Sequence, residues 1–426
     1  MQETARLQTV IEFLTGLNET GLPADRFMQG QWRLRRYAGS KDRAAVAERF
    51  FTILRQRAHL SWRMGVAPMG PEAPRALTIG ALLAEGKNLD EVEALFSGSG
   101  YGPSALTDAE RAVIATTPAD MPAWMAGEYP EWLEGDLEQT LGGDLPVAMA
   151  AMQDRAGIDL RVNSLKATRD QVQALLAEEG YPALPTPYSP HGLRLPGGGA
   201  TTRLSALKAF QDGWFEFQDE AAQLASMLCA ARPGIRLLDL AAGAGGKSLA
   251  LAAIMANEGQ IVAYDIIPDR LNRLAARATR AGVTNIHTAE EEVTGRFDVV
   301  LVDAPCSGTG TWRRQPELRW RLTPERLVEL KTVQSALLDR AAGLTAAGGR
   351  LVYATCSLLP GENDDQVADF LARHEGWSVR RADQVWAELA QTAPAGLPPG
   401  MLEFFHAAPH TTGTDGFFTA ILQAPA

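Results

Sequence analysis

The chain has 426 residues, of which 46% are hydrophobic and 21% charged, and a formal net charge of −11. A globular composition at this length predicts two or three domains. The first residues lack a basic stretch followed by an apolar run, and no segment holds about 18 uninterrupted apolar residues, so we expect a cytoplasmic protein that does not bind membranes.

The acidic net charge disfavours nucleic-acid binding over the whole surface, because phosphate contacts normally come from basic residues. The charge is unevenly distributed, however. Residues 1–66 hold 11 Lys and Arg against 6 Asp and Glu, whereas residues 67–160 hold 4 against 16. A basic surface can therefore be local.

Three cysteines, Cys229, Cys306 and Cys356, form an odd and sparse set. Such a set is typical of free thiols in a reducing compartment. The sequence contains no CxxC pattern, and its single HxxxH pair, His406 and His410, has no cysteine near it in the sequence, so no metal site is expected.

Residues 1–130 are predicted to form a helical domain. Val46, Phe50, Ile53 and Leu54 share one helical face, and no strand pattern interrupts this region. A smaller α+β domain is predicted to follow over residues 131–215. Its expected elements are a helix near 132–152, a strand near 160–162 and a helix over 169–179.

From residue 216 to 426, short apolar strands alternate with helical stretches. This alternation is typical of a doubly wound, parallel α/β sheet. The expected strands are Ile235–Leu240, Gln260–Asp265, Phe297–Asp303 and Arg350–Ala354, with a further candidate near Ile286.

A glycine-rich loop, residues 241–247, follows the first of these strands. Glycines at the carboxyl end of a strand let the backbone approach a nucleotide closely, although such a loop alone would also suit NAD. Asp265 ends the next strand, where a carboxylate can accept both hydroxyls of an adenosine ribose. One of Glu290, Glu291 and Glu292 could hold the adenine amino group.

Two of the thiols follow neighbouring strands. Cys306 comes after the strand that ends at Asp303, and Cys356 comes after the next strand, so both should face one pocket at the same edge of the sheet. Cys229 lies at helical spacing from apolar residues and is expected to be buried.

Methylation of a pyrimidine carbon is a reaction that needs a thiolate at such a place. C5 of cytosine is a poor nucleophile, but a thiolate that adds to C6 makes the ring enamine-like and able to attack a sulfonium methyl. A base must then remove the C5 proton and the thiol must leave, which gives a second residue a task. Asp303 can hydrogen-bond the N3 and N4 edge of the base. The strand pattern does not say which thiol attacks.

In combination these motifs resemble the Nol1/Nop2/Sun family of RNA 5-methylcytosine methyltransferases. The resemblance implies a class I, Rossmann-like methyltransferase domain that uses S-adenosylmethionine. The matching stretches follow the family's order and are Phe217–Asp219, Leu237–Lys247, Asp303–Gly310, Arg313–Pro316, Thr355–Ser357, Glu362–Asn363 and Gly416–Phe418.

The resemblance also gives the two thiols an order. The family's nucleophile falls on Cys356, in Thr-Cys-Ser, while Cys306, in Asp-Ala-Pro-Cys-Ser, matches the cysteine that helps to release the product. In DNA cytosine methyltransferases the Pro-Cys cysteine attacks instead, so the two families imply opposite roles.

The family's cofactor loop reads Cys-Ala-Ala-Pro-Gly-Gly-Lys, and this chain departs from it at three positions. Its loop is therefore expected to be less rigid. The cofactor-binding residues that the resemblance implies are Ala241, Ala242, Gly243, Ala244, Gly245, Gly246, Lys247, Asp265 and Asp303, with Glu290 in place of a family Asp.

The family also implies RNA as the partner. Leu160–Asn163 resembles its small RNA-recognition-like unit, and residues 42–55 resemble the NusB-like helical domain of its 16S ribosomal RNA member. Basic and aromatic side chains suit single-stranded RNA. Those expected to contact RNA are Arg33, Arg35, Arg36, Arg313, Arg314, Arg319 and Arg321, with Trp312 and Trp320.

The leading hypothesis is a monomeric cytosine-5 methyltransferase of 16S ribosomal RNA. Transfer RNA is the nearest rival substrate. A second class of function is a non-catalytic RNA-binding factor in ribosome assembly that has kept the fold. A methyltransferase for proteins or small molecules would not explain two thiols.

Overall fold

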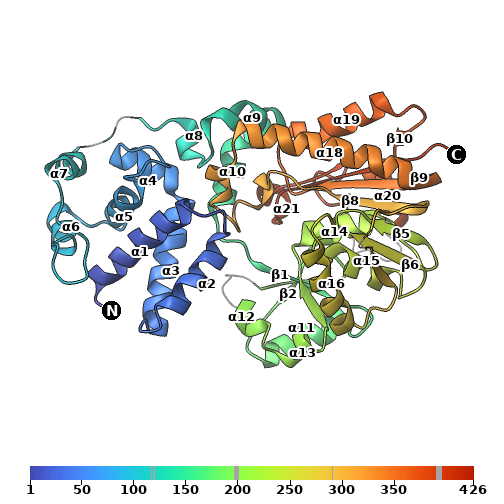
Figure 1. Ribbon diagram of the computed structural model, residues 1–426, viewed down its shortest axis with the longest axis horizontal. Coiled ribbons are helices and arrows are strands. Elements are labelled where there is room, and N and C mark those ends of the chain that lie inside the picture. The colour runs from blue at the N-terminus through green and yellow to red at the C-terminus, as the bar shows by residue number, and fades with distance from the viewer. Residues whose placement is uncertain (117, 119, 196–200, 290, 390–395) are drawn as a thin grey trace. The chain divides into compact units, whose positions relative to one another are not determined.

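The computed structural model describes residues 1–426 except 117, 119, 196–200, 290 and 390–395 (Figure 1). The chain divides into two compact units. The first unit comprises Met1–Glu138, Gly142–Gln153 and Trp312–Leu322, and the second comprises Gln139–Leu141, Asp154–Thr311 and Thr323–Ala426. The domain borders predicted at residues 130 and 215 stay predictions.

The first unit is helical in its described residues. As predicted, Val46, Phe50, Ile53 and Leu54 share a fully buried face, which packs in one cluster with Phe13. The helices up to residue 153 are α1 (Glu3–Asn18), α2 (Ala24–Leu34), α3 (Ser40–Arg55), α4 (Arg57–Met64), α5 (Ala73–Ala84), α6 (Leu89–Leu95), α7 (Asp108–Ala115), α8 (Ala123–Ala126), α9 (Glu134–Leu141) and α10 (Leu145–Gln153).

Local capping explains several of these helix boundaries. Asn88 and Glu91 form a capping box at the start of α6, and Thr107 and Glu110 form one at the start of α7. Each box satisfies backbone N–H groups that the first turn of a helix leaves unpaired. The helix predicted over 132–152 is interrupted at Gly142–Asp144 by a 3-10 turn, which separates α9 from α10.

The second unit begins with a small antiparallel sheet of order β2-β3-β1-β4. All five residues of β1 are buried because the strand pairs on both sides, with β3 and with β4. The sequence predicted β1 and α11 and missed the other three strands. The elements are β1 (Ile158–Val162), α11 (Arg169–Glu178), β2 (Leu184–Pro185), β3 (Gly192–Leu195), α12 (Thr201–Leu204), α13 (Lys208–Gln211) and β4 (Phe215–Phe217).

An eight-stranded sheet forms the core of the second unit, and the α/β, Rossmann-like fold is confirmed. Its path is β10-β12-β9-β8-β5-β6-β7, with β11 paired to β12. The strands are β5 (Arg236–Asp239), β6 (Gln260–Tyr264), β7 (Ile286–Ala289), β8 (Phe297–Asp303), β9 (Thr345–Thr355), β10 (Ser378–Val379), β11 (Phe405–Ala407) and β12 (Phe417–Gln423).

The expected all-parallel sheet is a mixed sheet. Strands β5 to β9 run parallel as predicted, whereas β12 pairs antiparallel with β9 and adds β10 and β11 at that edge. Only the start of β12 was noticed in the sequence, as the motif Gly416–Phe418. Its residues are nearly all buried, so it lacks the alternation that marks a strand with one exposed face.

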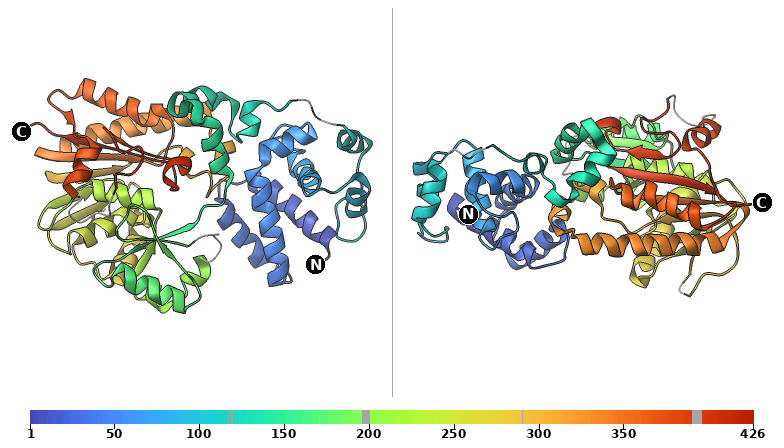
Figure 2. Two further views of the ribbon diagram at one scale, coloured as in Figure 1. Left: turned by 180° about the vertical axis from the view of Figure 1, so that it is seen from behind. Right: turned by 90° about the horizontal axis from the view of Figure 1, so that it is seen from above.

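Helices cover both faces of this sheet (Figures 1 and 2). Leu237 of β5 packs in a cluster with residues of α14, α15 and α20, while its neighbour Leu238 packs on the opposite face with residues of α18 and α19. The helices are α14 (Glu220–Leu228), α15 (Gly246–Ile254), α16 (Pro268–Ala281), α18 (Pro324–Leu344), α19 (Asp364–Arg373), α20 (Ala382–Leu389) and α21 (Pro409–Thr412).

The strand order reverses at β5, which lies between β6 on one side and β8 on the other. In doubly wound sheets, ligands bind where the strand order reverses, beyond the carboxyl ends of the strands. The loops that leave β5 and β8 at this point are the glycine-rich loop and the loop of Cys306.

Candidate active site

The glycine-rich loop begins where β5 ends and leads into α15. Gly243 and Gly245 have φ values of +56° and +80°, which residues with a Cβ rarely adopt. A Cβ on Gly245 would lie 2.0 Å from Cδ1 of Leu274, whereas the space beside Gly243 is open. The loop therefore packs tightly against α16 and leaves its backbone accessible at Gly243.

Asp265 holds this loop from the end of β6. Its carboxylate accepts the N–H of Gly243 and the N–H of Ile267, both at 2.8 Å, and Arg270 lies 3.6 Å away. Each carboxylate oxygen can accept two donors. Asp265 can therefore fix the loop and still accept a ribose hydroxyl.

For the adenine contact, the sequence predicts one of three glutamates beyond β7. Glu290 lies outside the described residues, and Glu291 and Glu292 are exposed. Ile266 and Ile267 follow Asp265 directly and are 83% and 43% exposed. They offer an apolar surface on which a flat base could pack.

Two arginines that the sequence analysis did not assign to this site hold the loop from outside. Arg277 of α16 donates to the carbonyl oxygen of Ala244 at 2.6 Å, and Arg161 of β1 donates to that of Gly246 at 2.7 Å. Glu216 of β4 pairs with Arg277 at 3.0 Å. The contact of Arg277 supports the loop at Ala244, one of the positions where its sequence departs from the family's.

Burial lowers the pKa of Arg161 to about 10, so its guanidinium stays charged near neutral pH. The sequence pointed to Arg161 only as part of the stretch expected to position RNA. Asn163 of that stretch donates to the carbonyl oxygens of Gly213 and Ala281, at 2.9 and 2.8 Å. Both side chains thus bind backbone carbonyl oxygens of the second unit.

The two predicted thiols meet at the carboxyl edge of the sheet. Strands β8 and β9 are parallel neighbours with Asp303 opposite Ala354, and the Sγ atoms of Cys306 and Cys356 lie 3.3 Å apart. Both side chains are half-buried. Cys229, directly after α14, is fully buried, as expected, and burial raises the pKa of its thiol.

The pKa of Cys306 is raised well above the usual value for a thiol. The main cause is the hydrogen bond with Cys356, and burial and the negative charge of Glu362 act in the same direction. The raised pKa favours the protonated form of Cys306, and either sulfur can donate the S–H across this contact.

Asp303 links the thiol loop to the glycine-rich loop. Its Oδ2 lies 2.6 Å from Nζ of Lys247, and Nζ also lies over the ring of Phe417, 4.9 Å from its centroid. The side chain of Lys247 is 8% exposed and that of Asp303 is 37% exposed. The carboxylate is thus fixed from below and remains accessible to a ligand.

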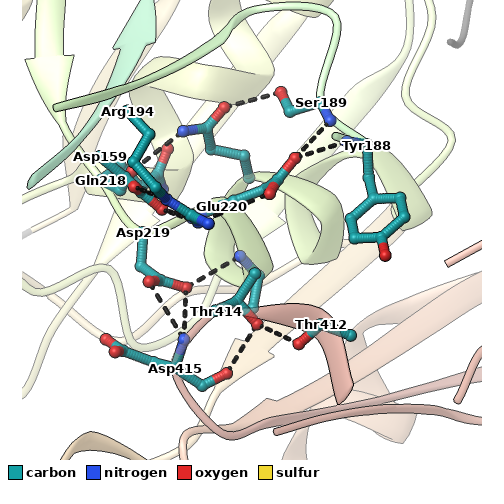
Figure 3. Close-up of polar contacts among 12 residues, drawn as sticks. Asp159, Tyr188, Ser189, Arg194, Gln218, Asp219, Glu220, Thr412, Thr414 and Asp415 are labelled. Carbon is teal, nitrogen blue, oxygen red and sulfur yellow. Dashed lines mark hydrogen bonds and ion pairs between the residues drawn. The ribbon is translucent and has the colours of Figure 1, made fainter. Parts of the chain in front are cut away.

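The motifs Phe217–Asp219 and Gly416–Phe418 are joined in space (Figure 3). Asp219 caps α14 by accepting the N–H of Ala221 at 2.9 Å, and it also accepts the N–H of Asp415 at 3.1 Å. Asp415 stands two residues before Phe417. The capping carboxylate therefore helps to place the ring on which Lys247 rests.

Two glycines hold the Cys306 loop against the start of β12. The N–H of Gly416 donates to the carbonyl oxygen of Gly310 at 2.8 Å, and the N–H of Gly310 donates to that of Cys356 at 2.9 Å. A Cβ on Gly310 would lie 2.2 Å from the carbonyl oxygen of Gly416. Only glycine permits this close approach.

The expectation that Trp312, Arg319 and Arg321 contact RNA is corrected by the structure. This segment belongs to the first unit, where Trp312 and Arg319 are fully buried. Arg319 donates to the carbonyl oxygen of Met152 at 2.7 Å, and Arg321 donates to that of Leu22 at 2.9 Å. The prediction treated this segment as an exposed basic helix, because the sequence does not show that the segment packs against the helices of the first unit.

The basic residues near the end of α2 are partly accessible. Arg33 and Arg36 are exposed, whereas Arg35 is half-buried and pairs with Glu12 at 2.9 Å. Next to them, Leu34 is 77% exposed and Tyr37 is 73% exposed. We call Arg33, Leu34, Arg36 and Tyr37 the α2 patch.

A Rossmann-like sheet with a glycine-rich loop and acidic strand ends at its switch point defines a class I methyltransferase fold. Solved structures agree with this fold. A protein designated PH0851 superposes with a TM-score of 0.77 at 24% identity over 99% of each chain. NSun6 from Pyrococcus horikoshii, crystallised with SFG, gives a TM-score of 0.61 at 22% identity over 70% of this chain and 99% of its own.

Two family models match the sequence. Residues 226–423 match the family described as 16S rRNA methyltransferase RsmB/F, and residues 129–202 match the ferredoxin-like domain of RsmF/B-like methyltransferases. The chain thus belongs to the RsmB/F family of methyltransferases, within the Nol1/Nop2/Sun group.

Curated relatives match over a large part of the chain. The probable ribosomal RNA small subunit methyltransferase B of Synechocystis is 38% identical over 286 residues, which is 64% of this chain and 61% of that protein. Ribosomal RNA small subunit methyltransferase B of Photorhabdus laumondii is 35% identical over 273 residues, 62% and 58% of the two chains. The chain spans about six-tenths of the length of these relatives.

Among the described residues, no helix is long and apolar enough to cross a membrane.

Proposed function

We propose that the chain transfers a methyl group from S-adenosylmethionine to C5 of a cytosine in small-subunit ribosomal RNA. The observation that carries this proposal is the thiol pair, with 3.3 Å between the Sγ atoms of Cys306 and Cys356. Few methyl transfers need two thiols, whereas methylation of a pyrimidine carbon needs one thiol to attack and a further group to aid release.

The residues around the glycine-rich loop fit S-adenosylmethionine. The open space beside Gly243 and the free acceptor positions of Asp265 suit the sugar and backbone contacts of a nucleoside. The carboxylate of Asp303 suits a cationic amino-acid group. When bound, S-adenosylmethionine supplies an electrophilic methyl group.

The chain's own residues account for the activation of cytosine. The thiolate of Cys356 adds to C6, and the electrons of the C5–C6 bond become available for C5 to attack the methyl group. Asp303, fixed by Lys247, accepts a hydrogen bond from the N4 amino group and so orients the base. The target base must leave its stack to reach this edge of the sheet.

Release of the product reverses the addition. A solvent base takes the C5 proton, the C5–C6 double bond reforms and the bond from C6 to the sulfur of Cys356 breaks. Cys306 lies within hydrogen-bond distance of the departing sulfur and carries a proton because its pKa is raised. An S–H at Cys306 can stabilise the expelled thiolate, which supports attack by Cys356 and release by Cys306.

Ribosomal RNA as the substrate is supported by the names of the relatives and by the α2 patch. Its exposed arginines and Tyr37 combine phosphate contacts with a ring for stacking, as single-stranded RNA requires. The NusB-like character of the N-terminal helices stays part of the proposal.

The test is to incubate the protein with labelled S-adenosylmethionine and purified 16S ribosomal RNA, 23S ribosomal RNA or transfer RNA, and to identify the modified nucleoside by mass spectrometry. We expect 5-methylcytosine in 16S ribosomal RNA. If only transfer RNA were labelled, transfer RNA would be the substrate in place of ribosomal RNA. A methylated nucleoside other than 5-methylcytosine would refute the proposed reaction. Tight RNA binding without any transfer would favour an assembly factor.

A further inference from the structure

Glu362 connects the two thiol loops, which are the segments that follow β8 and β9 and carry Cys306 and Cys356. It is fully buried and lies just before α19. One oxygen, Oε1, accepts the N–H of Ser307 at 2.9 Å, and the other, Oε2, accepts the hydroxyls of Ser307 and Ser357 at 2.5 Å each. Ser307 follows Cys306 directly, and Ser357 follows Cys356 directly. A single carboxylate thus binds the residue next to each thiol.

The remaining acceptor position of this carboxylate is also filled. Gln334 of α18 donates to Oε1 at 2.9 Å. A carboxylate offers about four acceptor positions, and here four donors occupy them, so the group is both satisfied and fixed in direction. Hydrogen bonds to a charged acceptor in a buried site are stronger than neutral ones.

Asn363 fixes the thiol loop of Cys356 on the other side. Its Nδ2 donates to the carbonyl oxygen of Ser357 at 3.0 Å, and its Oδ1 accepts the hydroxyl of Thr355 at 2.6 Å. Asn363 therefore contacts the residues before and after Cys356. Glu362, in contrast, binds Ser307 and Ser357 and so reaches both loops, which also contact each other directly through Thr309, whose Oγ1 accepts the N–H of Leu358 at 2.8 Å.

We infer that Glu362 is a positioning residue that holds Cys306 and Cys356 at the spacing their reaction needs. The thiol-holding role concerns the geometry of the folded chain, and only its importance for catalysis rests on the proposed function. Glu362 touches neither substrate nor the reacting sulfur atoms; it acts through Ser307 and Ser357.

The test compares Glu362→Gln with the wild type and with Glu220→Gln. Glutamine has nearly the same shape but presents an NH₂ group where one carboxylate oxygen accepts two donors, so it removes the bridge that the carboxylate makes between the loops. Glu220 is an equally buried carboxylate whose Oε1 accepts two backbone N–H groups, of Tyr188 and Ser189, at 2.7 Å each (Figure 3). The contacts of its carboxylate are with residues 186–194, outside both thiol loops.

The readout is the equilibrium between the Cys306–Cys356 dithiol and its disulfide in a glutathione buffer, without RNA or S-adenosylmethionine. Two thiols give up two protons and two electrons to one glutathione disulfide, which becomes two glutathione thiols, and alkylation with mass spectrometry counts the remaining thiols. Thiols held together have a high effective concentration, so we expect Glu362→Gln to lower the equilibrium constant about tenfold or more. Glu220→Gln should leave it within about twofold.

An unchanged or higher constant in folded Glu362→Gln, or an equal fall in Glu220→Gln, would overturn the inference. If Glu362→Gln does not fold, Ser307→Ala combined with Ser357→Ala removes the two hydroxyl donors and keeps the charge; it should lower the constant in the same direction, and no change would again overturn the inference. A protein without methyl transfer would still give this redox result, so the two proposals can fail separately.

Discussion

The ammonium group of Lys247 and the carboxylate of Asp303 form an ion pair, with 2.6 Å between Nζ and Oδ2. Lys247 is the last residue of the glycine-rich loop, and Asp303 is the last residue of β8, the strand that leads to Cys306. The ion pair therefore joins the glycine-rich loop after β5 to the loop after β8, and the two loops form one site.

Loss of this pair should impair methyl transfer. Lys247→Met keeps most of the side-chain length but leaves the Asp303 carboxylate without its partner, and we expect kcat/KM to fall by roughly ten- to a hundredfold, since the carboxylate is partly exposed. Incorporation of a labelled methyl group into RNA measures this. Lys208→Met is the matched control, because Lys208 pairs with Asp212 at 2.8 Å on the surface. If Lys247→Met and Lys208→Met transferred the methyl group at equal rates, Lys247 would have no role in the active site.

The two thiols should behave differently when each is replaced. Cys306→Ala retains the attacking thiol but lacks the donor for the departing sulfur, so a covalent protein–RNA adduct should accumulate. Cys356→Ala should form no adduct. Denaturing gels with labelled RNA distinguish these outcomes, and Cys229→Ala, which changes only a buried thiol, should resemble the wild type. The reverse pattern for Cys306 and Cys356 would exchange their roles.

The support of the glycine-rich loop by Arg277 predicts an effect on cofactor binding. Arg277→Met removes the hydrogen bond to the carbonyl oxygen of Ala244 and the pair with Glu216. We expect the Kd for S-adenosylmethionine to rise about tenfold, as measured by calorimetry, with a smaller change in kcat at saturation. Arg273→Met changes an exposed arginine one turn earlier on α16 and should not alter the Kd. A fall in kcat alone would contradict the supporting role.

Asp239 should make the stability of the second unit depend on pH. Burial raises the pKa of this carboxyl from 3.8 to about 7. Between these values the folded chain binds more protons than the unfolded chain, so the contribution of Asp239 is fully present below about pH 4 and is lost as the pH rises to about 7. Asp239→Asn can still accept the hydroxyl of Ser248 and should show a smaller loss.

Urea denaturation at several pH values between about 4 and 8 tests this sign. The free energy of unfolding should fall less steeply with rising pH in Asp239→Asn than in the wild type. Asp298→Asn, at an exposed position of β8, provides the control. Parallel curves for wild type and Asp239→Asn would show that Asp239 does not titrate in this range.

The α2 patch predicts a salt-dependent loss of RNA affinity. Replacing both Arg33 and Arg36 by Gln should lower the slope of log K against log salt by about one to two, since each phosphate contact to single-stranded RNA contributes about 0.7. Tyr37→Ala should weaken binding about tenfold with little change in slope. Arg326→Gln, which alters a surface arginine paired with Glu329, is the control. An unchanged slope in the double variant would place RNA elsewhere.

The site residues at the ends of strands could be predicted from the sequence. The contacts that hold their side chains and loops in place could not. Asp265, Asp303, Cys306 and Cys356 follow apolar runs, and parallel strands bring such positions to one edge without further information. Arg277, Glu216 and Glu362 stand in ordinary helix, strand and turn sequence, respectively. Their partners are distant along the chain, so their roles appear only when the elements pack.

The segment Trp312–Arg321 shows the opposite error. Its arginines and tryptophans have the composition of an RNA-binding surface, and local sequence alone favours solvent exposure. In the structure, Trp312 and Arg319 complete the core of the first unit, where the guanidinium of Arg319 lies over the Trp312 ring and donates to a carbonyl oxygen. A buried arginine that donates to backbone carbonyl oxygens cannot be distinguished from an exposed one by the sequence pattern alone.

Because Trp312–Leu322 belongs to the first unit, that unit is not finished when its N-terminal 153 residues have left the ribosome. Roughly 170 further residues must be made before the segment appears, which at about 5–20 residues per second takes roughly 10 to 30 s. During that interval the pocket for Trp312 and the carbonyl oxygens that bind Arg319 and Arg321 lack their partners. The nascent first unit is therefore expected to be a client of chaperones, and its final consolidation is tied to synthesis of the thiol-bearing half of the chain.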